Sequence, residues 1–301
     1  MTYTVSANGA DTQLTASLNR LIHVLLLDMS DLVGAGLVTY YGDAGGALSA
    51  THKVARVDWD DAMSAPTEGA AISSATAVST SNVTIAVARQ ALYREVSDLI
   101  SGTGSAISDE DIARAMAVSA VLRRTDMVAA LFGSLSSSVG NSGVDMTTDD
   151  FYDAIFTLEQ ALVPGPFAAV LYPVQYTDLK SSIRGEGGPA QYIPATQDQT
   201  LAKGPGYKGM FAGVELYASD SVAASGGNSQ GAMFGRGCFG YRDMSAQNIP
   251  TVDLQLVDPT SPIWVERERV AVNGETQIVG NYYFGVSEIE DARGVLIETD
   301  R

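Results

Sequence analysis

One long helix, predicted from Ser108 to Phe132, constrains the fold of this chain more than any other segment. Ser108 suits the N-cap position, residues 109–111 are acidic where the helix dipole is positive, and Gly133 marks the end. At 1.5 Å per residue the helix would be about 37 Å long. Its apolar residues surround most of the circumference, so we expect apolar neighbours on several sides. They are Ile112, Met116, Val118, Val121, Leu122, Met127, Val128, Leu131 and Phe132.

The segments before this helix predict an extended region. Residues 34–82 are small and polar and cannot build a core of their own. In and just after this segment, residues 54–59 and 84–88 alternate as two strands of an extended hairpin. Further upstream, residues 13–33 carry leucines at three- and four-residue steps, which predicts an amphipathic helix. Either this chain's own core or a partner subunit would cover that helix.

The segments after the long helix predict a second helix, a strand and a third helix. A flexible-looking link at residues 133–140 leads to a helix that Thr147 opens. Residues 167–172 form a buried strand, and Pro173 occupies the first turn of a helix that ends at Ile183. The buried face of the helix after Thr147 comprises Phe151, Ile155, Leu158 and Leu162.

The last third predicts strands joined by turns. Residues 185–209 are rich in Gly and Pro and predict a long irregular loop, before strands at residues 213–218 and 231–234. Residues 263–272 and 276–286 alternate on either side of Asn273-Gly274. Asn-Gly accepts the positive φ angles of a type I′ turn, so this pair predicts a tight hairpin.

Composition describes a folded chain of 301 residues, with 46% hydrophobic and 18% charged residues and 30 glycines for tight turns. One large irregular domain and two modest ones both fit this length. The net charge of -17 argues against broad binding of nucleic acid through its phosphates.

Cys238 is the single cysteine, so no intrachain disulfide forms, and we expect a buried thiol. The apolar run at residues 21–27 is too short to span a bilayer and lacks the basic flank of a leader.

Motif searches assign no catalytic, metal-binding or cofactor-binding residue. The glycines of residues 235–240 match a dinucleotide-binding loop in spacing, but no helix is predicted after them. Residues 42–46 are similar to a serine-protease nucleophile segment, yet Ala44 stands where the serine would be. His23 and His52 form neither a metal-binding pair nor a triad.

The remaining charged candidates have structural explanations. The acidic pair Asp60-Asp61 lacks a partner pattern, and residues 149–150 already suit a helix N-terminus. Arg123 and Arg124 would contact nucleic acid or a neighbouring subunit, or they would lie solvated on the helix. We therefore expect a protein that is not an enzyme.

The order of these segments resembles the major capsid proteins of tailed bacteriophages, the HK97-like fold of the α+β class. The resemblance rests on the long helix as the spine helix, 108–132, on strand residues 83–90 before it, on residues 167–179 and 209–219, and on the closing hairpin, 264–286. It implies an N-terminal arm at 1–40, an extended loop at 41–82, a peripheral domain at 83–146, an axial domain at 147–250, and peripheral return strands at 251–301.

The resemblance also implies a function and partners. The protein would be a virion capsid component, a structural protein that self-assembles in the host cytoplasm into hexamers and pentamers of an icosahedral viral head around double-stranded DNA. Partners would be a portal protein, a possible decoration protein and DNA held by weak contacts, with no membrane. Because no long helical extension precedes the arm, a separate scaffolding protein is implied.

Three alternatives stay open at this point. An encapsulin-like nanocompartment shell resembles the same fold but encloses enzyme cargo. A non-shell β-rich binding protein or adhesin would be exported without assembling. An enzyme with an unrecognised acidic site would bind a divalent metal through a carboxylate cluster.

Overall fold

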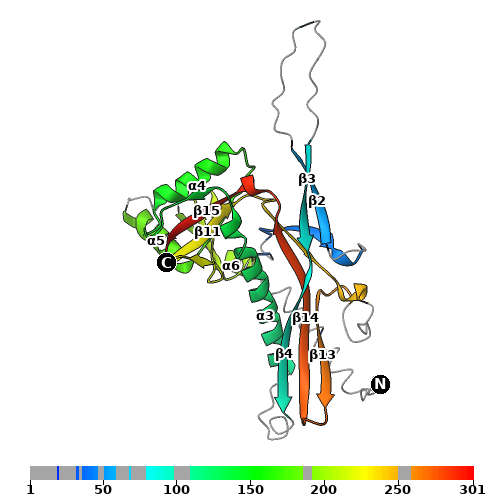
Figure 1. Cartoon of the computed structure of the whole chain (residues 1–301). Coiled ribbons are helices and arrows are strands. Elements are labelled where there is room, and N and C mark those ends of the chain that lie inside the picture. The colour runs from blue at the N-terminus through cyan, green and yellow to red at the C-terminus, as the bar shows by residue number, and fades with distance from the viewer. Residues whose placement is uncertain are drawn as a thin grey trace.

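The computed structural model describes residues 19, 32–33, 36–46, 51–58, 68, 79–97, 109–185, 192–249 and 259–301. Two sheets, two layers of helices and one projecting hairpin make up this part of the chain (Figure 1). The predicted helix at 13–33, Ser108 and the pair Asp60-Asp61 lie outside the described residues, apart from Asn19, Leu32 and Val33.

A five-stranded sheet forms the elongated half of the molecule. Its long central strand β14 pairs with β12 and β13 along one edge and with β4 along the other, all antiparallel, while β1 adds to β12 in parallel. Two short 3₁₀ turns adjoin it, η1 (Ala44–Gly46) and η4 (Ala246–Asn248). The strands are β1 (Thr39–Asp43), β4 (Ala88–Ser97), β12 (Phe239–Asp243), β13 (Ile263–Val270) and β14 (Glu275–Glu288).

The long helix α3 (Asp109–Ala129) lies against this sheet, close to its predicted range. It ends at Ala129, and Phe132 instead begins the 3₁₀ turn η2 (Phe132–Ser134). Small residues on one side let it approach the sheet: Ala113 and Ala120 are buried, and a Cβ at Gly280 of β14 would lie 2.8 Å from the Met116 sulfur. The expectation of apolar neighbours on several sides is wrong for the side that carries Val118 and Leu122, which is exposed.

An eight-stranded mixed sheet forms the second half, which we call the lobe. Its order is β5-β15-β11-β6-β9-β8-β7, with β10 paired to β11. The strands are β5 (Ser138–Val139), β6 (Ala168–Leu171), β7 (Tyr192–Pro194), β8 (Tyr207–Phe211), β9 (Val214–Ala218), β10 (Ala224–Ser225), β11 (Asn228–Phe234) and β15 (Gly294–Asp300). The helices are α4 (Thr148–Gln160), α5 (Pro173–Gly185) and α6 (Gln197–Lys203).

Alternating side chains of the lobe sheet feed two cores. On one face, Ala169, Leu171 and Met233 pack with apolar residues of α4 and α5. On the other face, Val170 and Phe234 join the core that includes α3 and the five-stranded sheet. Because β6 is buried at all four positions, its helices and α3 cover both faces of the sheet.

Local signals explain several of these elements. Thr147 caps α4 as predicted, and its hydroxyl and backbone N–H exchange hydrogen bonds with Asp150 in a capping box. The same arrangement at Thr196 and Gln199 starts α6, so the prediction of an irregular loop throughout 185–209 is wrong. The link at 133–140 is anchored, because the Ser136 backbone N–H donates to Asp291 at 2.8 Å and β5 pairs with β15.

Two predicted details differ from the structure. The β13–β14 hairpin is confirmed, but Val270 pairs with Glu275 and the turn has four residues rather than two. Within it Gly274 has a φ of +62°, while Asn273 keeps a negative φ, so the turn is not type I′. Leu162 is not part of the buried face of α4, because the helix has ended and this side chain is 88% exposed.

Sheet membership crosses the domain boundaries expected from the sequence. β12, inside the expected axial range of 147–250, pairs with β14 in the five-stranded sheet. β15, inside the expected return range of 251–301, pairs with β11 in the lobe. The physical reason is that β14 ends at Glu288, after which the 3₁₀ turn η5 (Asp291–Arg293) carries the chain over to the lobe.

The hairpin consists of β2 (Thr51–Asp58) and β3 (Ser79–Ala86), paired in antiparallel register with Val54 opposite Val83. It projects from the body beside the lobe (Figure 1). β3 runs almost directly into β4, with only Val87 between the two strands. The predicted extended hairpin is therefore confirmed, with strands longer than expected.

Candidate assembly surfaces

The glycine segment at 235–240 connects two strands and holds no helix N-terminus. It joins β11 to β12, and Gly237 adopts a φ of +86° in the turn. The Cys238 side chain is fully buried, as predicted, and burial raises the pKa of its thiol. The segment therefore lacks the helix dipole and free amides that would receive a pyrophosphate.

The other chemical candidates also have structural roles. Residues 42–46 end β1, and Asp43 accepts a hydrogen bond from the Gly45 backbone N–H at 2.7 Å. His52 lies within β2, and Arg123 Nε donates to Gln90 Oε1 of β4 at 2.9 Å. Among the described residues there is no group of three His, Cys, Asp or Glu side chains that could hold a metal ion. None of the described helices is long and apolar enough to cross a membrane.

The β2–β3 hairpin is a candidate contact surface because it lacks a core. On one face, His52 is paired with Ile85 and Val54 with Val83. Ile85 is fully buried near the body, whereas Val54 and Val83, two pairs further out, remain half-buried. An isolated two-stranded sheet is marginally stable in water. The outer part of the hairpin would therefore gain stability from a surface that covers it.

A polar cluster fixes the root of the hairpin, between β1 and η4. The Asp43 carboxylate accepts from the backbone N–H and hydroxyl of Ser245, and from Asn248 Nδ2 at 3.1 Å. Arg242 is buried and donates to the backbone oxygens of Gly42 at 3.2 Å and Asp43 at 2.6 Å. These contacts join residues about 200 positions apart, so they hold the end of β1 and η1 against β12 and η4.

The root also holds a second carboxylate. Tyr40 Oη donates to Asp243 Oδ1 at 2.8 Å. Burial raises the pKa of Asp243, and the nearby Asp43 adds to this, while the Tyr40 hydrogen bond and Arg124 act in the opposite direction. The Asp243 carboxyl therefore holds its proton more readily than an exposed carboxyl does.

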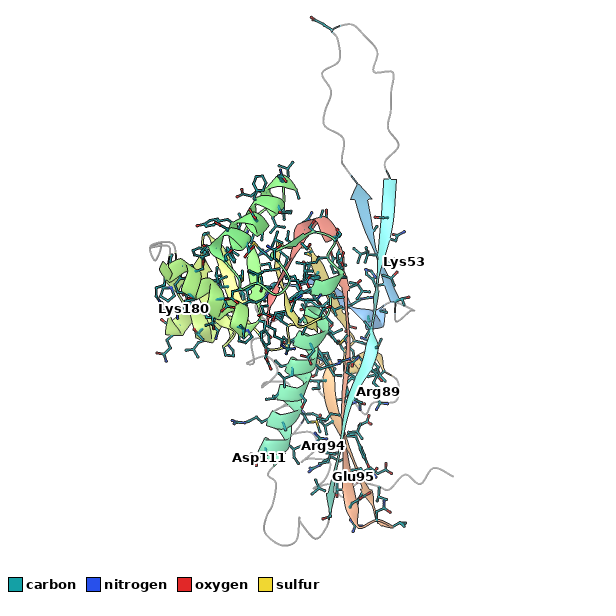
Figure 2. The ribbon with its side chains drawn as sticks, turned by 60° about the vertical axis from the view of Figure 1, so that its left-hand side comes forward. Lys53, Arg89, Arg94, Glu95, Asp111 and Lys180 are labelled. Atoms are coloured by element: carbon teal, nitrogen blue, oxygen red, sulfur yellow. The ribbon has the colours of Figure 1, made fainter. Side chains whose placement is uncertain are left out.

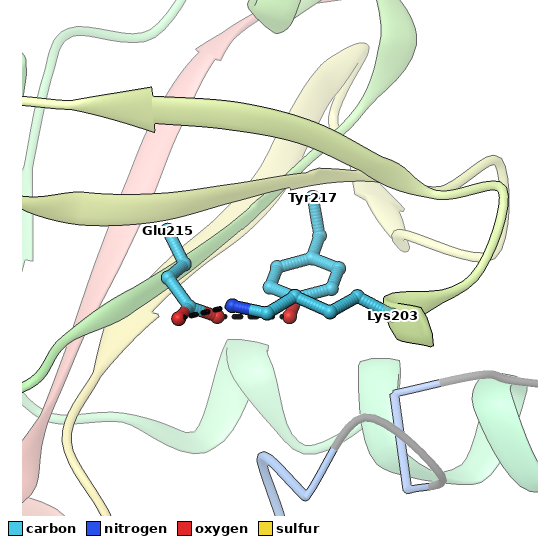
Figure 3. Close-up of polar contacts among 3 residues, drawn as sticks. All are labelled: Lys203, Glu215 and Tyr217. Carbon is cyan, nitrogen blue, oxygen red and sulfur yellow. Dashed lines mark hydrogen bonds and ion pairs between the residues drawn. The ribbon is translucent and has the colours of Figure 1, made fainter. Parts of the chain in front are cut away.

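A polar contact network lies on the face of the lobe sheet that joins the core shared with α3, where Tyr217 packs (Figure 3). Lys203 Nζ of α6 forms an ion pair with Glu215 Oε1 of β9 at 2.5 Å, and Tyr217 Oη donates to Glu215 Oε2 at 3.0 Å. Lys203 also lies over the Tyr207 ring, 4.8 Å from its centre. Sequence reasoning missed this network, which joins α6 to the sheet beside a cavity of about 180 Å³. Because each polar group already has a partner, the network suits a structural role.

Two charged side chains lie outside this network. Lys53 lies on the hairpin and Lys180 on α5, on opposite sides of the molecule in the view of Figure 2. Neither forms a hydrogen bond or ion pair with another described residue. Large apolar side chains are also exposed on two helices, namely Val118 and Leu122 on α3 and Phe156 on α4. The described surface thus offers contact features rather than a catalytic constellation.

Comparisons with known proteins identify the fold. No protein-family model matches the sequence, and no curated protein matches it. A solved structure from Mycobacterium phage Che8 matches with a TM-score of 0.63 at 16% identity, covering 89% of this chain and 91% of that one. The capsid of Ralstonia phage GP4 matches with a TM-score of 0.63 at 11% identity and 91% coverage of both chains.

A third match is an encapsulin complex from Synechococcus elongatus, with a TM-score of 0.58 at 14% identity, covering 87% of this chain and 85% of that one. The chain therefore has the fold of capsid-shell proteins. Within that class it has the HK97-like α+β fold, as the sequence predicted.

Proposed function

We propose that this protein is the major capsid protein of a tailed bacteriophage. It would assemble into the hexamers and pentamers of an icosahedral head that encloses double-stranded DNA. The observation that carries this proposal is the capsid fold over nearly the whole chain, complete with a hairpin that cannot form its own core. Wedge-shaped subunits of this kind associate through heterologous contacts that close by rotation.

The parts of the chain take distinct roles in this proposal. The five-stranded sheet with α3 is the peripheral domain, the eight-stranded lobe is the axial domain, and β2–β3 is the extended loop. The arm at 1–40 would contact neighbouring subunits. This division follows sheet membership, so β12 goes to the peripheral domain and β15 to the axial domain.

Partners follow from the same proposal. A portal protein would occupy one vertex, a separate scaffolding protein would guide assembly in the host cytoplasm, and a decoration protein would bind the finished shell. The net charge of -17 limits the attraction of the shell for DNA, so contacts with the packaged genome would be weak.

A nanocompartment shell is the second candidate, because an encapsulin is among the structures that match. The two kinds of shell differ in what they enclose, DNA in a phage head and an enzyme in a nanocompartment. The test is to express the chain with and without its genomic neighbours, and to study the products by sedimentation and negative-stain electron microscopy. Closed shells with nuclease-protected DNA support the phage head, and shells filled with an enzyme support the nanocompartment. A protein that stays monomeric with its neighbours present would overturn both.

A further inference from the structure

The outer face of α4 exposes apolar side chains beside carboxylates. Tyr152 is 40% exposed, Phe156 is 58% exposed, and Leu162, just after the helix, is 88% exposed. The carboxylates of Asp149, Asp153 and Glu159 are exposed on the same helix. We call these six residues the α4 surface. Large apolar side chains gathered on one exposed helix are typical of contact sites.

Leu162 is unfavourable for the isolated subunit in two separate ways. Its φ of +54° is in the left-handed region, at the position of a helix end where glycine is usual. The Leu162 N–H donates to Glu159 O at 3.0 Å and the Val163 N–H to Leu158 O at 3.1 Å, which fixes this backbone. Its side chain is also left in water. Both the left-handed backbone and the exposed apolar side chain of Leu162 lower the stability of the isolated subunit. We infer that such a residue serves a function, here a contact with another molecule.

The same chain carries a surface of opposite charge on α5. Lys180 and Arg184 are exposed on one side of this helix, and neither pairs with another described residue. At 100° per residue, Asp178 lies away from both, and its carboxylate is close to other carboxylates instead. We call Lys180 and Arg184 the α5 surface.

We propose that the α4 surface of one copy docks on the α5 surface of the next copy around a ring. In a chain with a net charge of -17, contacts between copies are repulsive on average, so an acidic apolar surface is best complemented by exposed cations such as Lys180 and Arg184. The two surfaces differ, so the contact is heterologous and closes a ring by rotation. This inference rests on the proposed function, and it names the lobe helices that hold neighbouring subunits together.

Cysteine cross-linking tests the pairing directly. Glu159→Cys and Lys180→Cys are made as separate variants of the full chain, and Cys238 contributes little background because it is buried. Under mild oxidation the mixed variants are expected to form a disulfide-linked heterodimer, while neither variant alone does. A homodimer of Glu159→Cys alone, or no cross-link in the mixture, would overturn the heterologous pairing.

A second variant separates contact from folding. Leu162→Gly relieves the left-handed backbone, so the subunit should be at least as stable to heat, yet its assembled fraction should fall roughly tenfold. Val272→Gly, at a side chain 95% exposed in the β13–β14 turn, is the matched control and should assemble normally. If Leu162→Gly forms shells as well as wild type, the docking is wrong and shell assembly stands. If wild type forms no shell with its neighbours, the proposed function itself fails.

Discussion

The lobe and the β2–β3 hairpin are both built from short strands, yet they obtain stability from different sources. In the lobe, β6 is buried at all four positions between two cores. In the hairpin, Ile85 is fully buried at the root, whereas Val54 and Val83, two pairs further out, are only half-buried. The lobe therefore folds on contacts within the chain. The hairpin folds on its root and, we infer, on a neighbouring subunit.

The largest expected effect comes from removing a ring in the lobe core. Phe234 is 1% exposed and packs against the rings of Phe132 and Phe239 at 5.9 and 5.0 Å between centres. Phe234→Ala should lower the free energy of unfolding by about 3–5 kcal/mol, measured by urea denaturation. Phe156→Ala, at an exposed ring, should change it by less than about 0.5 kcal/mol. Equal losses for both would contradict the placement of the core.

A smaller effect is expected at the root of the hairpin. Asp43→Ala removes the acceptor for Gly45, Ser245 and Asn248 and should cost about 2 kcal/mol in unfolding free energy. Proteolysis within β2, residues 51–58, should also become faster, because η1 before this strand is no longer held. The control is Asp220→Ala, at an exposed position after β9. If both variants behave alike, the root cluster does not anchor the hairpin.

The outer hairpin should show a loss of assembly without a loss of folding. Val83→Ser removes half-buried apolar surface that a neighbouring copy would cover, so the subunit should lose less than about 1 kcal/mol. The fraction that sediments as rings or shells should fall several-fold. Thr84→Ser, on the exposed opposite face, is the matched control. A normal yield of shells from Val83→Ser would show that this face is not a contact.

The smallest effect concerns pH. Burial raises the pKa of Asp243 above its usual 3.8, so the folded subunit binds this proton more tightly than the unfolded chain does. The resulting stability is fully present below the unfolded value and is lost as the pH rises through the higher folded value. Asp243→Asn, which mimics the protonated form, should flatten this dependence in denaturation measured from pH 3.8 upward. An unchanged slope would exclude Asp243 as its source.

Local signals predicted those elements whose causes lie within a few residues. The cap at Thr147 predicted the start of α4, and the turn at Gly274 predicted the last hairpin. The start of α6 carries the same signal, Thr196 followed by Gln199, and would have been found by a search for capping boxes. Short-range hydrogen bonds leave a mark in the sequence that reasoning from one chain can detect.

Long-range pairings explain what the sequence could not predict. β1 pairs in parallel with β12, and the chain crosses from the five-stranded sheet to the lobe, where β15 pairs with β11. Backbone hydrogen bonds form these pairings, and they leave no pattern of side chains in the sequence. Leu162 fits the periodicity of α4, but the helix ends before it and its side chain points to solvent. The proposed α4 and α5 surfaces were not predicted for the same reason, because the exposure of a residue depends on where neighbouring elements pack.

The most direct test of shell assembly is an electron cryomicroscopy reconstruction of particles made by the chain with its genomic neighbours. The account predicts icosahedral shells in which the β2–β3 hairpin of each copy is covered by a neighbouring copy. Shells whose hairpins stand free in solvent would contradict the role of the hairpin. A chain that remains monomeric or dimeric would contradict the central claim that it builds a shell.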